Sequence, residues 1–216
     1  MREGRFADVA AAILLGGASS RMGRDKGHVE VGGVAAATRL ARLAASLFED
    51  VALVGGAPPA EAPGRRVADR PGPPCALRGV ATALAEARAP RVLVLAVDLP
   101  LLTPDVLLAL VACAEADVVA PRTPGGLEPL CALYRVEAAL PLARARLASG
   151  ELSLQGLLGA LDVATLQGDD LASADPDGSA LLNVNTPDDL ARAESLLAAR
   201  AGRRAQAASP RRAGGI

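Results

Sequence analysis

Residues 8–27 read DVAAAILLGGASSRMGRDKG, an apolar run followed directly by a loop of glycine, serine and cations. A continuous apolar run is typical of a strand buried on both faces of a parallel sheet. Gly16 and Gly17 allow the backbone to approach a ligand closely, so that amide groups can donate to phosphate oxygens. Arg21 and Lys26 supply the cations that such a ligand needs. On composition alone, phosphate binding and an ordinary solvent-exposed loop are both open interpretations.

The loop matches neither of two common phosphate-binding motifs. A Walker A loop has Ser or Thr directly after Gly-Lys, whereas Gly27 and His28 follow Lys26 here. The dinucleotide-binding pattern G-x-G-x-x-G is also missing from this stretch. The position of the loop after a strand still favours a ligand site, because open α/β sheets bind ligands at the carboxyl ends of their strands.

Apolar runs that alternate with helix-like stretches determine the expected fold class. The expected strands are residues 8–15, 49–55, 91–97 and 116–121, and the expected helices are residues 35–47, 76–87 and 104–115. Alternation of this kind predicts a mostly parallel sheet with helices on both faces. We therefore expect an α/β three-layer sandwich around a mostly parallel, Rossmann-like central sheet.

The last third of the chain is less regular. Residues 127–135 predict a strand that enters a helix over residues 136–149. The run ALLNVN over residues 180–185 predicts a final strand. The sequence TPDDL that follows it predicts a helix start capped by Thr186.

Composition excludes several classes of function. The net charge is −1 and only 1% of the residues are aromatic, so the chain offers neither a basic field nor a stacking platform for nucleic acid. The three cysteines have no metal-binding or disulfide spacing. Because no apolar run reaches membrane-spanning length, we expect a cytoplasmic protein without a membrane partner. The expected domain covers residues 1–200, and residues 201–216 are expected to be a disordered tail.

A second candidate site follows the apolar run VLVLAV. Asp98 ends this strand and so lies at the expected ligand edge, where Mg²⁺ with a triphosphate needs one or two protein oxygens. The alternative is an aspartate that only organises the turn before the helix capped by Thr103. Asn183 and Asn185 raise the same question, because strand alternation would turn both amides to one face.

The complete loop resembles the signature L-x-G-G-x-S-x-R-M-G-x-D-K of the molybdenum cofactor guanylyltransferases, the MobA-like branch of the nucleotidyltransferase family. The resemblance extends over about residues 8–200, and it implies the fold of the nucleotide-diphospho-sugar transferase type. It also implies that Leu15, Gly16, Gly17 and Lys26 bind the nucleotide.

Three further segments are similar to motifs of that family. D-x-P at Asp98 is similar to its metal-binding aspartate motif, which implies a Mg²⁺ cofactor and a nucleotide contact at Asp98. N-x-N-T-P is similar to an active-site motif, which implies Asn185 as a second metal residue with Asn183 supporting it. Asp69 and Gly79 match a segment that contacts the nucleotide.

The chain departs from the family pattern at four positions. Cys75 and Ala76 stand where the family usually has Gly-Pro, and Glu128 replaces a glutamine on the acceptor side. Arg78 replaces a small residue, and its side chain is open to two interpretations, facing phosphate or lying in solvent. These departures leave the base open, although the Gly-Gly pair of the loop favours guanine over cytosine.

The reaction that the resemblance implies is attack by the terminal phosphate of molybdopterin on the α-phosphorus of GTP, which releases pyrophosphate. A phosphate monoester is largely dianionic at neutral pH, so no general base is needed. Mg²⁺ at Asp98, together with Arg21 and Lys26 as catalytic residues, would neutralise the developing charge. GTP and molybdopterin are the expected partners, and contact with proteins of molybdoenzyme maturation is a further expectation.

Three alternatives remain open at this point. The chain could be a cytidylyltransferase, or it could transfer GMP to a different small phosphate such as 2-phospholactate. It could also be an accessory protein that binds a nucleotide without turning it over. Compared with the reaction above, a cytidylyltransferase would use a different base and an enzyme for another small phosphate would use a different acceptor. An accessory protein would release no pyrophosphate.

Overall fold

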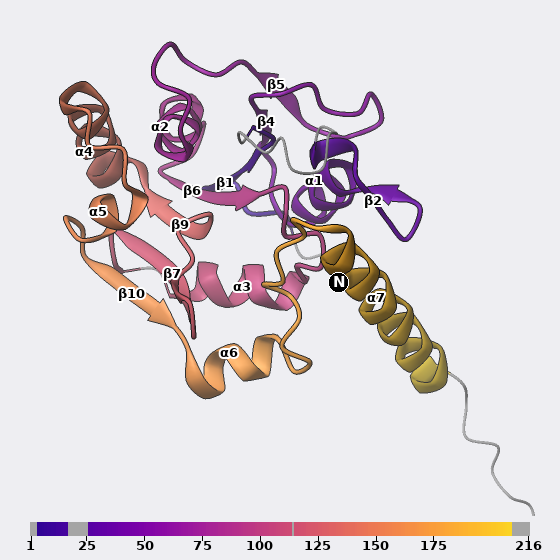
Figure 1. Ribbon diagram of the computed structural model, residues 1–216. Coiled ribbons are helices and arrows are strands. Elements are labelled where there is room, and N and C mark those ends of the chain that lie inside the picture. Colours follow the sequence, from indigo (N-terminus) through magenta and orange to yellow (C-terminus); the bar gives the residue numbers. More distant parts are fainter. Residues whose placement is uncertain (1–3, 17–25, 114, 209–216) are drawn as a thin grey trace, which may run out of the picture.

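The computed structural model describes residues 4–16, 26–113 and 115–208, and a mixed sheet lies at its centre (Figure 1). Its strands are β1 (Val9–Leu14), β4 (Val51–Val54), β5 (Arg65–Val67), β6 (Arg91–Ala96), β7 (Val118–Thr123), β8 (Gly126–Leu127), β9 (Cys131–Arg135) and β10 (Val163–Leu166). They are ordered β10-β7-β9-β6-β1-β4-β5, with β8 attached to β7. β9 is antiparallel to β6 and β7, whereas β1 pairs in parallel with β4 and β6. The mostly parallel sheet expected from the sequence is confirmed.

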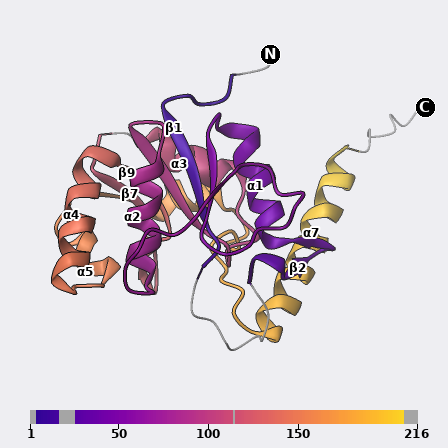
Figure 2. The same cartoon turned by 90° about the horizontal axis from the view of Figure 1, so that it is seen from above.

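Helices cover both faces of this sheet, as Figures 1 and 2 show from two directions. They are α1 (Ala36–Leu47), α2 (Ala76–Glu86), α3 (Pro104–Ala112), α4 (Val136–Ser149), α5 (Leu154–Leu158), α6 (Gly168–Ala174) and α7 (Pro187–Ala208). Val9, Ala11 and Ile13 of β1 belong to the core shared with α1, α3 and α6. The even-numbered side chains of β1 belong to the core shared with α2, α4 and α5. The expected three-layer sandwich is therefore confirmed, and no helix of the described residues is long and apolar enough to cross a membrane.

A small apolar cluster lies outside the two main cores that flank the sheet. It contains Val31, Leu101, Val184 and Ala193, all buried. Val31 belongs to a hairpin of β2 (Glu30–Val31) and β3 (Val34–Ala35), and Ala193 belongs to α7. Figure 2 shows α7 beside β2. The cluster thus joins the hairpin, the loop after β6 and the start of α7.

The expected strand over residues 180–185 is wrong. Val184, which is 5% exposed, and Leu182 belong to the small cluster, whereas Ala180 and Leu181 belong to the core shared with α1, α3 and α6. The segment does not pair with a strand of the sheet. It is held to the residues after β6 by a backbone hydrogen bond from Val184 N to Asp98 O at 2.8 Å. The chain enters the segment through a turn in which the Asp175 carboxylate accepts hydrogen bonds from the backbone of Ser179 and Ala180.

The end of the chain also differs from the expectation. Thr186 and Asp189 form the reciprocal cap that the sequence predicts, with Asp189 N donating to Thr186 Oγ1 at 3.1 Å and Thr186 N donating back to Asp189 Oδ2 at 2.9 Å. However, α7 continues to Ala208, beyond the expected boundary at residue 200. Residues 209–216 lie outside the described part of the chain.

Truncation of Leu95 to alanine is expected to lower the free energy of unfolding by about 2–5 kcal/mol, because this β6 side chain is fully buried between strands and helices. Urea denaturation measures the change. Leu108→Ala is the matched control, since Leu108 on α3 is 37% exposed and its loss should change stability by less than about 0.5 kcal/mol. Equal effects of the two truncations would contradict this placement of the core.

Candidate active site

One pocket of about 340 Å³ lies where β1, β4 and β6 end. The strand ends contribute Leu14, Leu15, Gly16, Val54, Ala96, Val97 and Asp98, with Leu130 beside Ala96, and α2 with the loop before it contributes Asp69, Pro74, Cys75, Ala76, Arg78 and Gly79. The register explains why the strand ends meet, because Leu14 pairs with Val54 on one side and with Ala96 on the other. Open α/β sheets bind ligands at this edge, so the pocket is the candidate active site.

Asp69 is seated directly over two strand ends. β5 pairs with β4 and leads the chain into this position, with Gly55 N donating to Val67 O at 2.9 Å. A Cβ atom added to Gly55 would lie 2.9 Å from Asp69 Oδ2, and one added to Gly16 would lie 3.8 Å from the same oxygen. Gly55 also has a φ of +69°. Glycine at residue 55 therefore gives the Asp69 carboxylate its space.

The Asp69 carboxylate forms an ion pair with Arg78 in the first turns of α2. Arg78 Nη2 lies 2.9 Å from Asp69 Oδ2, and Arg78 Nη1 donates to the Gly72 carbonyl at 3.1 Å. The side chains of Arg78 and Asp69 are 23% and 26% exposed, respectively. The expectation that the Arg78 side chain lies free in solvent is therefore wrong, since it is largely buried in this ion pair, and Arg78 is among the residues that line the pocket.

Gly79 lines the pocket and also allows α2 to approach β1. A Cβ atom at this position would lie 3.2 Å from Leu14 Cδ1, closer than most real contacts of a Cβ. Cys75 is the N-cap residue of α2, but its side chain accepts no capping hydrogen bond. Ala76 begins the helix. The departures from the family pattern at residues 75 and 76 thus form part of the pocket wall.

Glu128 lies outside the residues that line the pocket. Its Oε1 atom accepts a hydrogen bond from Thr123 Oγ1 at 3.1 Å, next to the turn between β7 and β8. Leu130, two residues further along, does line the pocket. The Glu128 carboxylate is therefore hydrogen-bonded to Thr123 at the end of β7.

Asp98 borders both the pocket and a smaller hollow that Val31 and Val184 also line. Asn183 and Asn185 flank buried Val184 and are both exposed. The hydrogen bond from Val184 N to Asp98 O holds this segment beside the aspartate. The structure therefore brings the Asn183–Asn185 segment to Asp98, although not through the expected strand.

The residues present at Asp98 fit a magnesium ion. No group of three or more His, Cys, Asp or Glu side chains suited to a metal occurs in the described residues. Mg²⁺ with substrate phosphates, however, needs only one or two protein carboxylates and keeps several waters. Asp98 and the Asn185 amide oxygen are hard donors of this kind, so they are the residues that could hold it.

Part of the glycine loop falls outside the described chain. Gly17 and Arg21 lie within residues 17–25, which the structure does not describe. Lys26 begins a short 3-10 helix, Lys26–His28, and the position of its side chain is likewise outside the description. Leu15 and Gly16 precede this gap and line the pocket. The roles predicted for Gly17, Arg21 and Lys26 therefore stay predictions.

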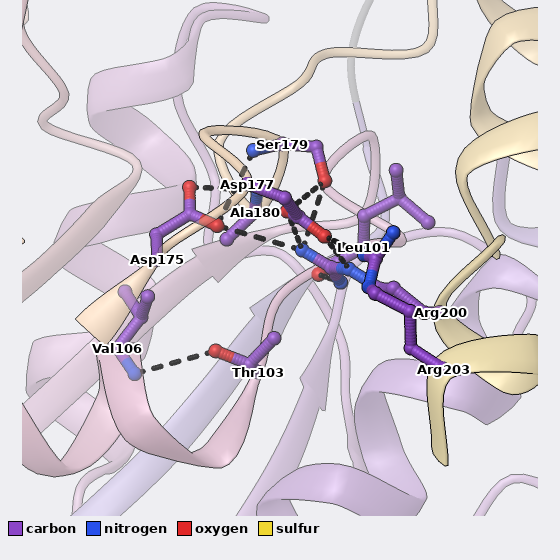
Figure 3. Close-up of polar contacts among 9 residues, drawn as sticks. All are labelled: Leu101, Thr103, Val106, Asp175, Asp177, Ser179, Ala180, Arg200 and Arg203. Atoms are coloured by element: carbon purple, nitrogen blue, oxygen red, sulfur yellow. Dashed lines mark hydrogen bonds and ion pairs between the residues drawn. The ribbon is translucent and has the colours of Figure 1, made fainter. Parts of the chain in front are cut away.

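Arg200 ties α7 to the loop after β6, as Figure 3 shows. It donates to the Leu101 carbonyl at 2.6 Å and to the two carboxylate oxygens of Asp177 at 3.0 and 2.9 Å. Its Nη2 also lies 3.5 Å from Oδ1 of Asp175, whose side chain is 5% exposed. Because Leu101 closely follows Asp98, the network fixes the loop behind this carboxylate.

The network shifts the two carboxyl groups in opposite directions. The hydrogen bond from Arg200 holds the pKa of Asp177 well below its usual range. Burial raises the pKa of Asp175, against the opposing hydrogen bonds from the backbone of Ala180 and Ser179. No pattern in the sequence predicted this network, and its only signal is the acidic pair DPD, which is also typical of a plain turn.

Relatives over most of the chain are known. Residues 11–164 match the family model of the MobA-like NTP transferase domain. A protein of Chloroflexus aggregans named probable molybdenum cofactor guanylyltransferase is 36% identical over 191 residues, which cover 84% of this chain and 91% of the relative. The molybdenum cofactor guanylyltransferase of Cereibacter sphaeroides is 34% identical over 193 residues, which cover 86% of this chain and 95% of the relative.

Solved structures with the same fold are also known. Molybdopterin-guanine dinucleotide biosynthesis protein A from Archaeoglobus fulgidus has a TM-score of 0.75 and 24% identity, over 88% of this chain and 99% of that one. The 2-C-methyl-D-erythritol 4-phosphate cytidylyltransferase of Thermus thermophilus has a TM-score of 0.65 and 18% identity, over 88% and 98%. At these identities the likeness establishes the fold alone.

Alanine at Gly55 is expected to destabilise the protein more than alanine at Gly150, although both glycines have a positive φ, of 69° and 79°. Each substitution incurs left-handed strain of about 1–2 kcal/mol, but only the Cβ at residue 55 would meet the Asp69 carboxylate. Thermal unfolding measures both. In an Asp69→Ala background the excess should disappear, and an excess that persists there would contradict this seating of Asp69.

Replacement of Arg200 by methionine is expected to lower the free energy of unfolding at neutral pH by about 3 kcal/mol, because it removes the cation from two partly or fully buried carboxylates. Chemical denaturation measures the loss. Arg203→Met is the matched control, since Arg203 also contacts Asp177 but is 57% exposed. An exposed pair of this kind should contribute less than about 1 kcal/mol.

The loss in Arg200→Met is also expected to depend on pH. Because the pKa of Asp177 is lowered in the folded protein, its stabilisation is complete above the unfolded carboxyl pKa of about 3.9 and is lost as the pH falls through the folded pKa. Protonation of Asp175, whose pKa is raised, also removes its need for a cation. The difference between wild type and variant should therefore shrink below about pH 4. A constant difference between about pH 7 and about pH 3 would contradict an ionic role.

Proposed function

The chain belongs to the MobA-like NTP transferase family, and on that premise we propose that it transfers GMP from GTP to the terminal phosphate of molybdopterin, with release of pyrophosphate. The names of relatives that cover most of the chain support a guanylyltransferase of molybdenum cofactor biosynthesis. The observation that carries the proposal is the pocket at the ends of β1, β4 and β6, which Gly16, Asp69, Gly79 and Asp98 line together. These four are positions that the family resemblance assigns to the nucleotide.

The pocket supports a nucleotide at this edge on physical grounds. Its walls are apolar side chains from three strand ends, which suit a base and a ribose, and its few charged groups are placed at two separate points. Asp69 and Arg78 lie on the wall formed by α2 and the loop before it, whereas Asp98 follows β6. In the proposed arrangement the nucleoside lies toward α2, and the phosphates lie toward Asp98.

Catalysis in this proposal rests on alignment and charge neutralisation. The attacking phosphate of molybdopterin is already largely dianionic at neutral pH, so no side chain has to remove a proton from it. Asp98 and Asn185 would hold Mg²⁺, which when bound neutralises charge on the phosphates of GTP. Lys26 and Arg21 would stabilise the departing pyrophosphate. Of these groups, the described part of the chain places Asp98 at the edge of the sheet where β1, β4 and β6 end, with the Asn183–Asn185 segment beside it.

Pyrophosphate release by purified protein with Mg²⁺ and molybdopterin, with GTP compared with CTP, tests the proposal. Release with GTP and not with CTP is the expected result. Release with CTP alone would replace the proposed base, and release with GTP only when 2-phospholactate replaces molybdopterin would replace the proposed acceptor. GTP binding without release in either case would make the protein a nucleotide-binding accessory protein and contradict catalysis.

Asp98→Ala is expected to lower kcat for pyrophosphate release about 100-fold. The substitution removes a carboxylate that would hold Mg²⁺, and the metal would neutralise charge on the phosphates. The substitution leaves the backbone oxygen of Asp98 free to keep its hydrogen bond from Val184 N. Asp105→Ala is the matched control, since Asp105 is an exposed acid in the first turn of α3 and lies outside the pocket. Near-native turnover in Asp98→Ala, with GTP still bound, would contradict the mechanism.

A further inference from the structure

Without Arg78, the described residues that line the pocket would carry only negative charge. Of the described residues that line the pocket, three carry charged side chains, namely Asp69, Asp98 and Arg78, and Arg78 pairs with Asp69. A nucleoside triphosphate is itself a polyanion. An uncompensated carboxylate in the wall of its pocket would repel it, most strongly where solvent screening is weak.

Asp69 cannot relieve that repulsion by moving away from the pocket. Its carboxylate is packed against the Gly55 backbone, where even one added methyl group would lie 2.9 Å from Oδ2. The preceding β5 strand pairs with β4, and the amide of Arg70 is held by Thr82 Oγ1 at 3.2 Å. Asp69 is thus fixed from both sides in sequence, so its charge stays at this point of the pocket wall.

Arg78 compensates it and fixes the adjoining wall at the same time. Its two terminal nitrogens bond to Asp69 Oδ2 and to the Gly72 carbonyl, so one guanidinium joins both parts of the loop before α2. The aliphatic stem packs on Gly72, whose added Cβ would lie 3.6 Å from Arg78 Cδ. Pro74 and Cys75, which follow this loop, are pocket-lining residues. Arg78 therefore determines both the charge and the shape of that wall.

Helix stability does not explain an arginine at this position. Arg78 lies in the first turn of α2, which begins at Ala76. The amino-terminal end of a helix carries partial positive charge and favours acidic residues, so a cation there is unfavourable by itself. The ion pair with Asp69 and the contact to Gly72 offset this cost.

We propose that Arg78 is a nucleotide-positioning residue of this chain, which neutralises Asp69 and holds the loop over residues 69–74 so that the pocket accepts the anionic nucleotide. The proposal rests on the proposed function, because it takes a nucleotide as the ligand. It assigns a role to a residue at which the chain departs from the family pattern. In this role Arg78 acts on binding and leaves the chemical step to groups elsewhere in the site.

The test is GTP affinity by calorimetry together with KM and kcat for Arg78→Ala. The dissociation constant and KM are expected to rise about tenfold, as for loss of a charge-assisted contact, while kcat changes less than about twofold. Arg78→Lys should recover only part of the affinity, because lysine keeps the charge but cannot bond to Asp69 and Gly72 in the same forked geometry. Unchanged affinity in Arg78→Ala would overturn the proposal, as would a loss confined to kcat.

Arg70→Ala is the matched control. Arg70 is adjacent to Asp69 in sequence and also forms an ion pair, with Glu86 at 2.6 Å, but its side chain is 49% exposed and it does not line the pocket. GTP affinity in this variant should equal that of wild type. An equal loss in Arg70→Ala and Arg78→Ala would mean that general surface charge is responsible, and it would overturn the proposal.

Asp69→Asn separates neutralisation from direct contact between Arg78 and phosphate. If Arg78 acts by compensating Asp69, its removal should weaken GTP binding much less in the Asp69→Asn background than in wild type. An undiminished, additive loss would overturn the neutralisation role. These measurements are distinguishable from failure of the proposed function, because wild type that binds GTP without releasing pyrophosphate contradicts only the guanylyltransferase, and the comparison of affinities still decides the role of Arg78.

Discussion

The in-register parallel pairing of β1 with β4 and β6 is the constraint on which the site depends. Leu14 is paired with Val54 on one side and with Ala96 on the other, so the three strands end at the same edge. Gly16 after β1 and Asp98 after β6 line the pocket, and Gly55 after β4 packs against the Asp69 carboxylate. Because β1 is buried along its whole length, a one-residue slip of the register would turn every one of its side chains into the opposite core and disturb the packing on both faces of the sheet.

A second layer of interactions supports the Asp98 side of this edge. The small cluster of Val31, Leu101, Val184 and Ala193 joins segments that are far apart in sequence. Arg200 closes the same region by bonding α7 to the Leu101 carbonyl and to the turn after α6. The loop after Asp98 is thus held from its far side, while the pocket side stays open for a ligand.

Local patterns predicted the parts of the molecule that local sequence determines. The apolar run of β1, the strand end at Asp98 and the capped start of α7 were predicted in place, because strand burial and helix capping depend on nearby residues. The ALLNVN segment was mistaken for a strand, since its apolar side chains pack partly in the main core and partly in the small cluster without joining the sheet. Partnerships such as Arg78 with Asp69, and Arg200 with Asp175, depend on tertiary packing, so no spacing in the sequence could show them. The β5 strand has only three residues, which is below the length at which alternation is informative.

The most direct test of the account is a crystal structure of the protein with Mg²⁺ and a GTP analogue that carries a methylene group between the α- and β-phosphorus atoms. We expect the guanosine to lie between the end of β1 and α2, with the Arg78–Asp69 pair intact. The α-phosphate should lie beside Asp98 with the metal between them. A nucleotide bound away from this pocket, or one with its phosphates turned from Asp98, would contradict the assignment of the active site.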